Sequence, residues 1–283
     1  MNILLLMRPK QWIKNLVIFA ALIFSKNLFA LEPFIKTLLG FLLICLLSGA
    51  IYLFNDIADR EKDKTHPLKS KRPIADDRIS VKNATIGGSL ICVITLALSY
   101  LLNPEFFLVA IAYAGLMIGY SFWLKKLVII DVLVIAMGFL LRAVAGAVLI
   151  KVEISVWLFI CAFLLALFLA LGKRRHELVL IGAQGREVLS HYSSEILDQL
   201  ISVTTAAVLV AYILYTVSAE TVVKFQTKWL VLTIPFVLYG IFRYLWLVYQ
   251  KKLGETPEKT LLVDKSLLAD VILWIISVIA IIT

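Results

Sequence analysis

Long runs of hydrophobic residues, separated by short polar stretches, dominate the sequence. A helix that crosses a lipid bilayer needs about 20 mostly apolar residues, and runs of this length recur along the chain. We predict nine spans, near residues 12–31, 35–54, 84–102, 106–124, 127–149, 154–172, 200–219, 229–249 and 266–283. The pattern therefore predicts an all-α fold, a polytopic membrane helix bundle.

Composition supports this class. Hydrophobic residues make up 61% of the 283 residues, against about 45–50% in soluble domains. Charged residues make up only 17%, against about 25%. No soluble core of this size could bury so much apolar surface, so we predict one membrane domain over residues 1–283. The span near 12–31 is the weakest of the nine, because Ser25, Lys26 and Asn27 interrupt it.

The positions of Lys and Arg predict the orientation. With the N-terminus in the cytoplasm, 21 of the 28 Lys and Arg residues fall in inner segments and five in outer loops. Such a bias is typical of cytoplasmic loops, so the net charge of +9 does not indicate nucleic acid. We expect a bacterial inner-membrane protein whose functional loops, 55–82, 124–131 and 173–199, are cytoplasmic.

The first polar cluster follows the second span, in the segment NDIADREKDKTHPLKSKRP. Asn55, Asp59 and Asp63 are spaced four residues apart, so they share one face if the helix continues past Phe54. Carboxylate and amide oxygens suit Mg²⁺. Cations follow at once, at Lys64, Lys69, Lys71 and Arg72, and can meet phosphate charge. The segment predicts a metal–diphosphate site; the alternative is a solvated loop of mixed charge.

A second cluster spans Tyr120 to Arg142. Lys125 and Lys126 lie in a short inner turn, and Asp131 opens the next span. Arg142 shares a helix face with Asp131, about 16 Å further into the membrane. Charges at such depth usually face a bundle interior. We interpret these residues as phosphate ligands, with structural pairing of Arg142 and simple topology marking by the lysines as alternatives.

A third cluster contains adjacent cations at the end of a span, Lys173, Arg174 and Arg175, followed by Arg186 and Tyr192. Arg is suited to bidentate phosphate contacts. An ordinary cytoplasmic flank is the alternative interpretation.

In this order and spacing, the segments NDIADREKD and YSFWLKKLVIID resemble the UbiA-type membrane prenyltransferase superfamily. The opening RPKQWIKN, together with GFLLRAVAG, KRRHEL and REVLSHY, is more similar to one branch of it, the decaprenyl-phosphate phosphoribosyltransferases. The resemblance runs from Arg8 to about Asp264.

The resemblance implies nine helices around a central cavity open to the cytoplasm. It implies transfer of phosphoribosyl from phosphoribosyl pyrophosphate to a polyprenyl phosphate, with Mg²⁺ bound by Asn55, Asp59 and Asp63. Asp59, Asp63 and Asp131 are the candidate catalytic residues. The candidate substrate-binding residues are the polar and cationic side chains of the matching segments: Lys14, Asn55, Lys64, Lys71, Arg72, Tyr120, Lys125, Lys126, Arg142, Lys173, Arg174, Arg175, Arg186 and Tyr192.

One departure separates the branches. Aromatic prenyltransferases of the superfamily usually carry a second Asp four residues after the first, whereas Ile135 follows Asp131 here. The missing acid favours phosphoribosyl transfer. Transfer of a prenyl group from its diphosphate to an aromatic acceptor is the alternative activity, and a transporter is the non-enzymatic alternative. The oligomeric state is left open, a homo-oligomer included.

Overall fold

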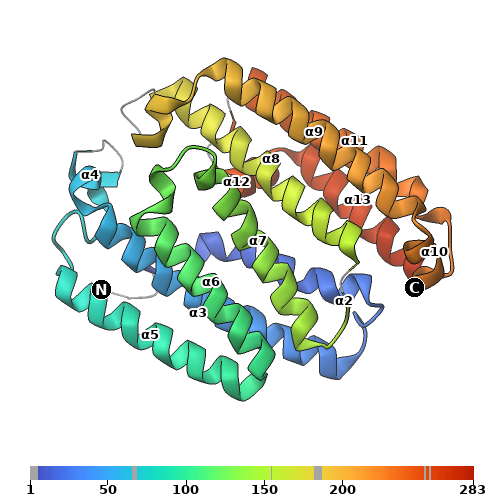
Figure 1. Cartoon of the computed structure of the whole chain (residues 1–283), viewed down its shortest axis with the longest axis horizontal. Helices are drawn as coiled ribbons and strands as arrows, with labels where there is room; N and C mark the ends of the chain where they lie inside the picture. The colour runs from blue at the N-terminus through green and yellow to red at the C-terminus, as the bar shows by residue number, and fades with distance from the viewer. Residues whose placement is uncertain (1–5, 66–68, 154, 182–186, 252, 255) are drawn as a thin grey trace. The chain divides into compact units, whose positions relative to one another are not determined.

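The computed structural model describes residues 6–65, 69–153, 155–181, 187–251, 253–254 and 256–283. Within these ranges all regular structure is helical (Figure 1), which confirms the predicted class. The helices are η1 (Pro9–Phe19), α2 (Ala20–Phe24), α3 (Leu31–Ala58), α4 (Arg60–Lys64), η2 (Lys69–Lys71), α5 (Val81–Leu102), α6 (Pro104–Phe122), η3 (Leu124–Lys126), α7 (Ile130–Leu149), α8 (Val156–Ile181), η5 (Glu187–His191), α9 (Ser194–Val217), α10 (Ala219–Phe225), η6 (Trp229–Thr233), α11 (Ile234–Gln250), α12 (Pro257–Val263) and α13 (Lys265–Ile282).

Eight of the described helical segments are long and apolar enough to cross a membrane: α3, α5, α6, α7, α8, α9, η6 with α11, and α13. They correspond to the last eight predicted spans. The chain is therefore an integral membrane protein. The first predicted span, 12–31, falls on η1 and α2, neither of which is long enough to be counted among the eight.

Contacts nevertheless show that η1 runs along α3 in the opposite direction. Arg8, just before η1, pairs with Asp56 near the end of α3. Further along, the Asn15 amide donates to Ser48 Oγ at 3.1 Å. The carbonyl of Ile18 then lies where a Cβ at Gly146 of α7 would be, so only glycine permits this approach. The N-terminal segment thus follows α3 as a 3₁₀ helix.

Side-chain caps explain where several helices begin. Side-chain oxygens of Ser80, Asn103, Ser193, Ser218 and Asp264 each accept a backbone N–H of the helix that follows. Such residues satisfy donors that have no partner in the first helical turn. The sequence therefore fixes the starts of α5, α6, α9, α10 and α13 locally.

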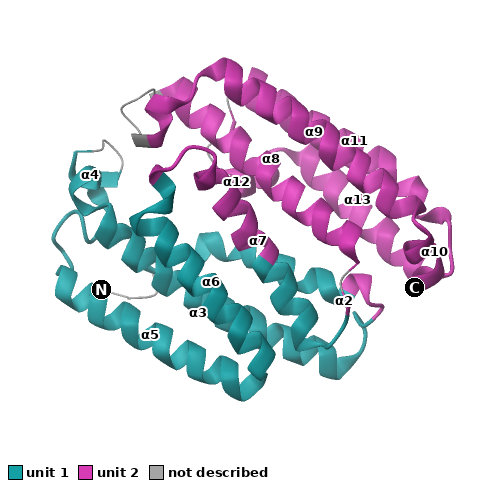
Figure 2. Cartoon of the chain, viewed as in Figure 1, with its two compact units in different colours: residues 1–22, 27–125, 141–152 teal, residues 23–26, 126–140, 153–283 magenta. Residues whose placement is uncertain are grey.

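The described chain divides into two compact units, coloured separately in Figure 2. Unit 1 contains residues 1–22, 27–125 and 141–152. In it α3 packs against η1, α5 and α6. Its core includes Ile18, Ile44, Leu47, Phe106 and Tyr113, all almost completely buried.

Unit 2 contains residues 23–26, 126–140 and 153–283. Here α8 packs against α9, and α11 packs against α9 and α13. Its core includes Phe168, Val188, Leu197, Leu247 and Tyr244. The first part of α7 belongs to this unit and the last part to unit 1. One domain over residues 1–283 stays a prediction.

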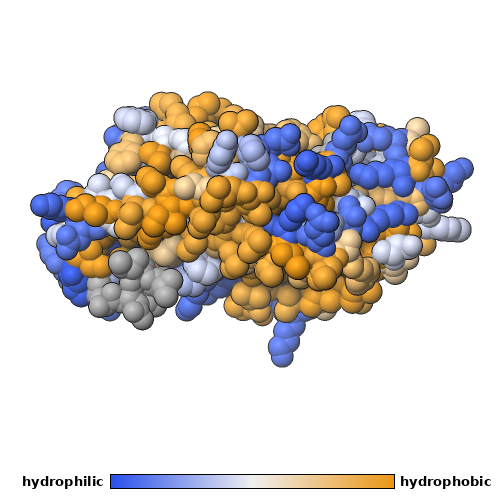
Figure 3. Space-filling view, turned by 90° about the horizontal axis from the view of Figure 1, so that it is seen from below, coloured by the Kyte–Doolittle hydropathy of each residue, from blue (hydrophilic) through white to orange (hydrophobic). Residues whose placement is uncertain are grey.

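Large apolar side chains lie on the outside of the spans. Leu101 is 78% exposed, Val203 69% and Leu90 58%. Apolar residues cover much of the face shown in Figure 3. Such surface would be unfavourable in water, so these side chains are expected to contact lipid.

Candidate active site

The Asp-rich segment of unit 1 lies at the end of α3. The helix continues past Phe54 as predicted, up to Ala58, and Asp59 caps it. The backbone N–H of Asp59 donates to the Asn55 carbonyl at 2.9 Å, and that of Asp63 donates to the Asp59 carbonyl at 2.8 Å. The helical spacing of Asn55, Asp59 and Asp63 therefore persists across the junction between α3 and α4.

Arginines join two of the carboxylates. Arg72 Nη1 donates to Asp63 Oδ2 at 2.6 Å and to Asp56 Oδ1 at 3.0 Å. Arg8 donates to the same Asp56 carboxylate. Both aspartates are almost completely buried, at 4% exposure for Asp63 and 5% for Asp56. Buried carboxylates need such partners, because an unpaired buried charge is very costly.

The remaining carboxylate, that of Asp59, forms an ion pair with a lysine. Lys125, after α6, donates from Nζ to Asp59 Oδ1 at 2.5 Å. The Asn55 amide donates to Asp59 Oδ2 at 3.2 Å. Three acids (Asp56, Asp59, Asp63) thus meet three cations (Arg8, Arg72, Lys125) in what we call the acid–cation cluster. Its formal charges cancel.

Burial and charge act in opposite directions on Asp63. Burial raises the pKa of its carboxyl, the charge and the hydrogen bond of the Arg72 guanidinium lower this pKa, and the net shift is upward. The Asp59 and Asp56 carboxylates raise the pKa slightly further. The three acids are therefore close enough to repel one another.

The donor atoms of the acid–cation cluster fit a hard cation. Carboxylate and amide oxygens on one helical face are the ligands that Mg²⁺ prefers, usually alongside phosphate oxygens and water. In the described part of the chain, however, no three acids, histidines or cysteines converge on one point as a closed metal site. The chemistry of Asn55, Asp59 and Asp63 thus suits an open site, with the remaining ligands supplied by a substrate.

The other predicted residues of unit 1 lie in different surroundings. Lys14 is half-buried in η1, and Tyr120 is buried near the end of α6. Lys64 contacts Glu61 at 3.2 Å and Asp77 at 4.0 Å, on the exposed side of α4. Lys71 is exposed in η2. The structure does not bring Lys64 or Lys71 to the three acids.

Arg142 is buried inside unit 1. It is 5% exposed, donates from Nη2 to the Tyr113 hydroxyl at 2.7 Å and lies 4.8 Å from the centre of the Tyr113 ring. This cation–π contact stabilises a charge in a low-dielectric interior. Arg142 therefore faces protein, as its depth in the span predicts.

In unit 2, Asp131 forms a fully buried ion pair. Arg174 Nε donates to Asp131 Oδ2 at 2.6 Å, and both side chains have 0% exposure. The Tyr192 hydroxyl donates to Asp131 Oδ1 at 3.0 Å and accepts the Ile129 N–H at 2.7 Å. Burial raises the pKa of Tyr192 to about 12, so this hydroxyl stays a donor at neutral pH.

Tyr192 connects this ion pair to a strained turn. Ile129 has a φ of 69°, a conformation that β-branched residues rarely adopt. Its N–H bond to Tyr192 ties the turn to Asp131. Within this conformation Asp131 and Arg174 are shielded from solvent, and their predicted catalytic and substrate-binding roles stay predictions.

The remaining cations of unit 2 are distributed differently. Lys126 is exposed, and Lys173 lies 3.9 Å from Glu177. Arg175 donates from Nε to Asp198 at 2.5 Å. Adjacent arginines on α8 therefore have separate partners. Arg186 lies outside the described residues.

Arg8 and Asp56 were not among the predicted site residues, although both belong to the acid–cation cluster. Asp56 shares the helix face of the predicted acids, and Arg8 begins the segment RPKQWIKN. Asp198, the partner of Arg175, was also missed. Its position near the start of an apolar span was the available signal.

The fold and the cluster define a polytopic all-α membrane protein with an acid-rich site at the end of a span. Residues 16–263 match the sequence model of the UbiA prenyltransferase family, and the chain belongs to this family. It is thus a membrane transferase of the UbiA type.

Two relatives are similar over nearly the whole chain. The decaprenyl-phosphate phosphoribosyltransferase of Mycolicibacterium smegmatis is 32% identical, over 95% of this chain and 88% of its own length. That of Corynebacterium glutamicum is 31% identical, over 96% and 84%. Among solved structures, a UbiA homologue from Archaeoglobus fulgidus, bound to GPP and Mg²⁺, has a TM-score of 0.76, 20% identity and coverage of 100% and 99%. This last similarity confirms the fold.

Proposed function

We propose that the protein transfers a 5-phosphoribosyl group from phosphoribosyl pyrophosphate to a polyprenyl phosphate, such as decaprenyl phosphate, and releases pyrophosphate. The observation that carries this proposal is the acid–cation cluster of unit 1, where each carboxylate is paired with a cation. Such a cluster suits a metal diphosphate, because acids attract the metal and cations attract the phosphate oxygens.

Asn55, Asp59 and Asp63 would hold Mg²⁺, which neutralises developing charge as a Lewis acid when bound. Arg72 and Lys125 would then bind oxygens of the departing pyrophosphate. Fixed cations stabilise this leaving group most strongly in the transition state, where its charge is greatest.

The bond changes need no general base from the protein. The bond between ribose C1 and the pyrophosphate oxygen breaks, and an oxygen of the acceptor phosphate forms the new bond to C1. That oxygen is already anionic, so it carries no proton to remove. The protein's task is to orient two phosphorylated substrates and stabilise charge.

Two further observations support this donor and acceptor. The relatives that match most of the chain are named for phosphoribosyl transfer to decaprenyl phosphate. In addition, Ile135 occupies the position where aromatic prenyltransferases usually carry an acid.

The test is product identity with the purified full-length protein. It is incubated with Mg²⁺, polyprenyl phosphate and labelled phosphoribosyl pyrophosphate, and the lipid phase is extracted. We expect label in the lipid for wild type and almost none for Asp59→Asn. Asp77→Asn is the matched control, since Asp77 lies in the same connection but is 64% exposed and pairs with Arg60. If only prenyl diphosphate and an aromatic acceptor give product, the proposal is wrong.

A further inference from the structure

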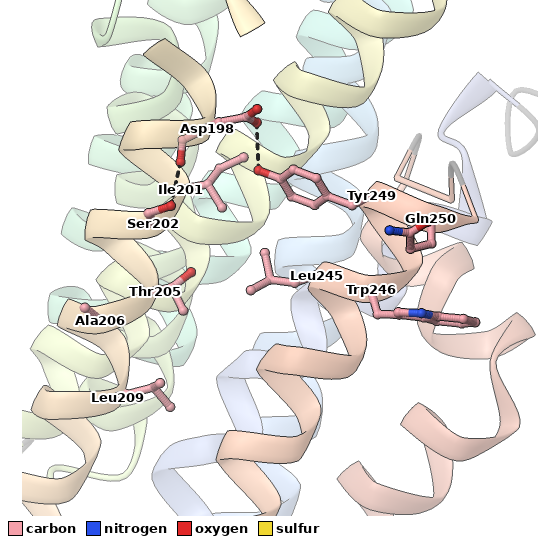
Figure 4. Close-up of a pocket in the computed structure, with 10 residues that line it drawn as sticks. All are labelled: Asp198, Ile201, Ser202, Thr205, Ala206, Leu209, Leu245, Trp246, Tyr249 and Gln250. Atoms are coloured by element: carbon pink, nitrogen blue, oxygen red, sulfur yellow. Dashed lines mark hydrogen bonds between the residues drawn. The ribbon is translucent and has the colours of Figure 1, made fainter. Parts of the chain in front are cut away.

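A groove runs between α9 and α11 in unit 2. It has a volume of about 670 Å³. Its lining includes Asp198, Thr205 and Leu209 from α9, and Leu245, Trp246 and Tyr249 from α11. In Figure 4 the side chains of Leu245 and Tyr249 point from α11 toward α9, whereas that of Trp246 points away from it. Both helices qualify as membrane spans, so lipid is the medium that this groove meets.

One end of the groove is polar. Asp198 accepts hydrogen bonds from Arg175 Nε at 2.5 Å and from the Tyr249 hydroxyl at 2.7 Å, the latter drawn in Figure 4. The Arg175 guanidinium lies only 3.7 Å from the centre of the Tyr249 ring. Lys251 follows α11, with Nζ 5.4 Å from the centre of the Trp246 ring. Cations beside interfacial Trp and Tyr are typical of the level of lipid headgroups.

The other end is apolar, formed by Ala206, Leu209 and Leu245. The groove thus changes from charged to apolar along the helix axes. A single lipid molecule lying parallel to the spans shows the same change, from a charged headgroup to an apolar chain.

A buried hydroxyl lies between these two ends. Thr205 is 9% exposed, and its Oγ1 has no hydrogen-bond partner in the described part of the chain. Figure 4 places Thr205 on the side of α9 that faces the groove. A buried hydroxyl without a partner is costly, and an acceptor at this level would remove that cost. The neighbouring Thr204 differs, because its hydroxyl donates to the Leu200 carbonyl at 2.7 Å.

We propose that this groove binds one glycerophospholipid. Its phosphate would contact Lys251 and Arg175, an ester carbonyl would accept the Thr205 hydroxyl, and an acyl chain would cover Leu209 and Leu245. Thr205 lies seven residues beyond Asp198, about 10 Å along α9. This order of phosphate, ester and chain is that of a glycerophospholipid. A polyprenyl phosphate has no ester carbonyl to offer Thr205.

The proposal can be tested by native mass spectrometry of the purified full-length protein in detergent. The protein is titrated with phosphatidylglycerol and with a diether lipid of the same headgroup and chain length. Wild type should bind the ester lipid about fivefold more tightly, as expected for one hydrogen bond. Thr205→Val should bind both lipids equally, and as weakly as wild type binds the diether. Thr204→Val, the matched control, should keep the ester preference.

Two further variants test the ends of the groove. Ala206→Trp, which fills the apolar end, should lose the bound lipid, and Lys251→Ala should weaken binding of both lipids. Equal affinity of wild type for ester and diether lipid would overturn the proposal. So would an equal effect of Thr204→Val and Thr205→Val, or displacement of the phospholipid by an equimolar amount of polyprenyl phosphate. None of these readouts depends on transferase activity.

Discussion

Replacement of Asp131 by Asn should lower stability strongly, because it leaves the Arg174 guanidinium charged and fully buried. Removing one partner of a buried ion pair costs about 3–5 kcal/mol. Arg174 also donates to Glu177 at 2.7 Å, so its charge keeps one acidic partner in the variant. We therefore expect a loss of about 3 kcal/mol in the free energy of unfolding, the lower end of that range. At about 2–4 °C per kcal/mol, the melting temperature should fall by roughly 6–12 °C.

The neighbouring arginine provides a matched control. Arg175 and Asp198 form an ion pair of similar length, 2.5 Å against 2.6 Å, but their side chains are 16% and 39% exposed rather than 0%. Exposed pairs contribute under about 1 kcal/mol. Asp198→Asn should therefore shift the melting temperature by no more than a few degrees.

The assay is a thermal-shift measurement of the purified protein in one detergent, with wild type and both variants side by side. Equal shifts for Asp131→Asn and Asp198→Asn would refute the reasoning from burial. The double variant Asp131→Leu with Arg174→Met removes both charges, and should recover most of the stability. If it is stable but inactive, one of the two side chains also serves the reaction; if it is active, both are structural.

Four other outcomes are expected. EDTA should abolish phosphoribosyl transfer by the wild-type protein, and Mg²⁺ should restore it; activity that survives EDTA would exclude the metal. Lys125→Ala should raise the KM of one phosphorylated substrate roughly ten- to a hundredfold, and an unchanged KM would remove Lys125 from the site. Single cysteines at Ser70 and Lys224 should be labelled from opposite sides of the membrane; labelling of both from one side would overturn the predicted orientation. Asp264→Asn should lower the melting temperature at pH 7, because hydrogen bonding and charge from Arg243 lower the pKa of Asp264 and stabilise the folded protein. The difference in melting temperature between wild type and variant should vanish as the pH falls through that lowered pKa, where Asp264 of the wild type is protonated too. A difference that stays constant with pH would contradict this reasoning.

The spans were predictable because the bilayer imposes a length on each of them. Predicted and observed ends of the span 84–102 differ by at most three residues, since no charged residue occurs between residues 83 and 104. The end of α8 was less predictable. It continues to Ile181, nine residues past the predicted 172, because ion pairs such as Arg174 with Asp131 stabilise a helix that is no longer apolar.

The ion-pair partners of the site residues could not be predicted from the sequence pattern. Helical spacing places Asn55, Asp59 and Asp63 together, but it does not reveal that Arg8, 48 residues before Asp56, pairs with it. Adjacent residues on a helix point about 100° apart, which separates Arg174 from Arg175. Their charges are alike in the sequence, and only their partners distinguish them: Asp131 of α7 for Arg174 and Asp198 of α9 for Arg175.

The 3₁₀ geometry of η1 determines which changes of length the N-terminal segment tolerates. Eleven residues at about 2.0 Å each cover about 22 Å, against about 16 Å in an α-helix. The segment is held at one end by the Arg8–Asp56 pair and further along by the close approach of the Ile18 carbonyl to Gly146. Inserting or deleting a single residue between these points would misplace one of them by about 2 Å. Substitutions on its outer side, as at the half-exposed Leu16, leave both attachments in place, so this part of the chain should accept changes of residue but not of length.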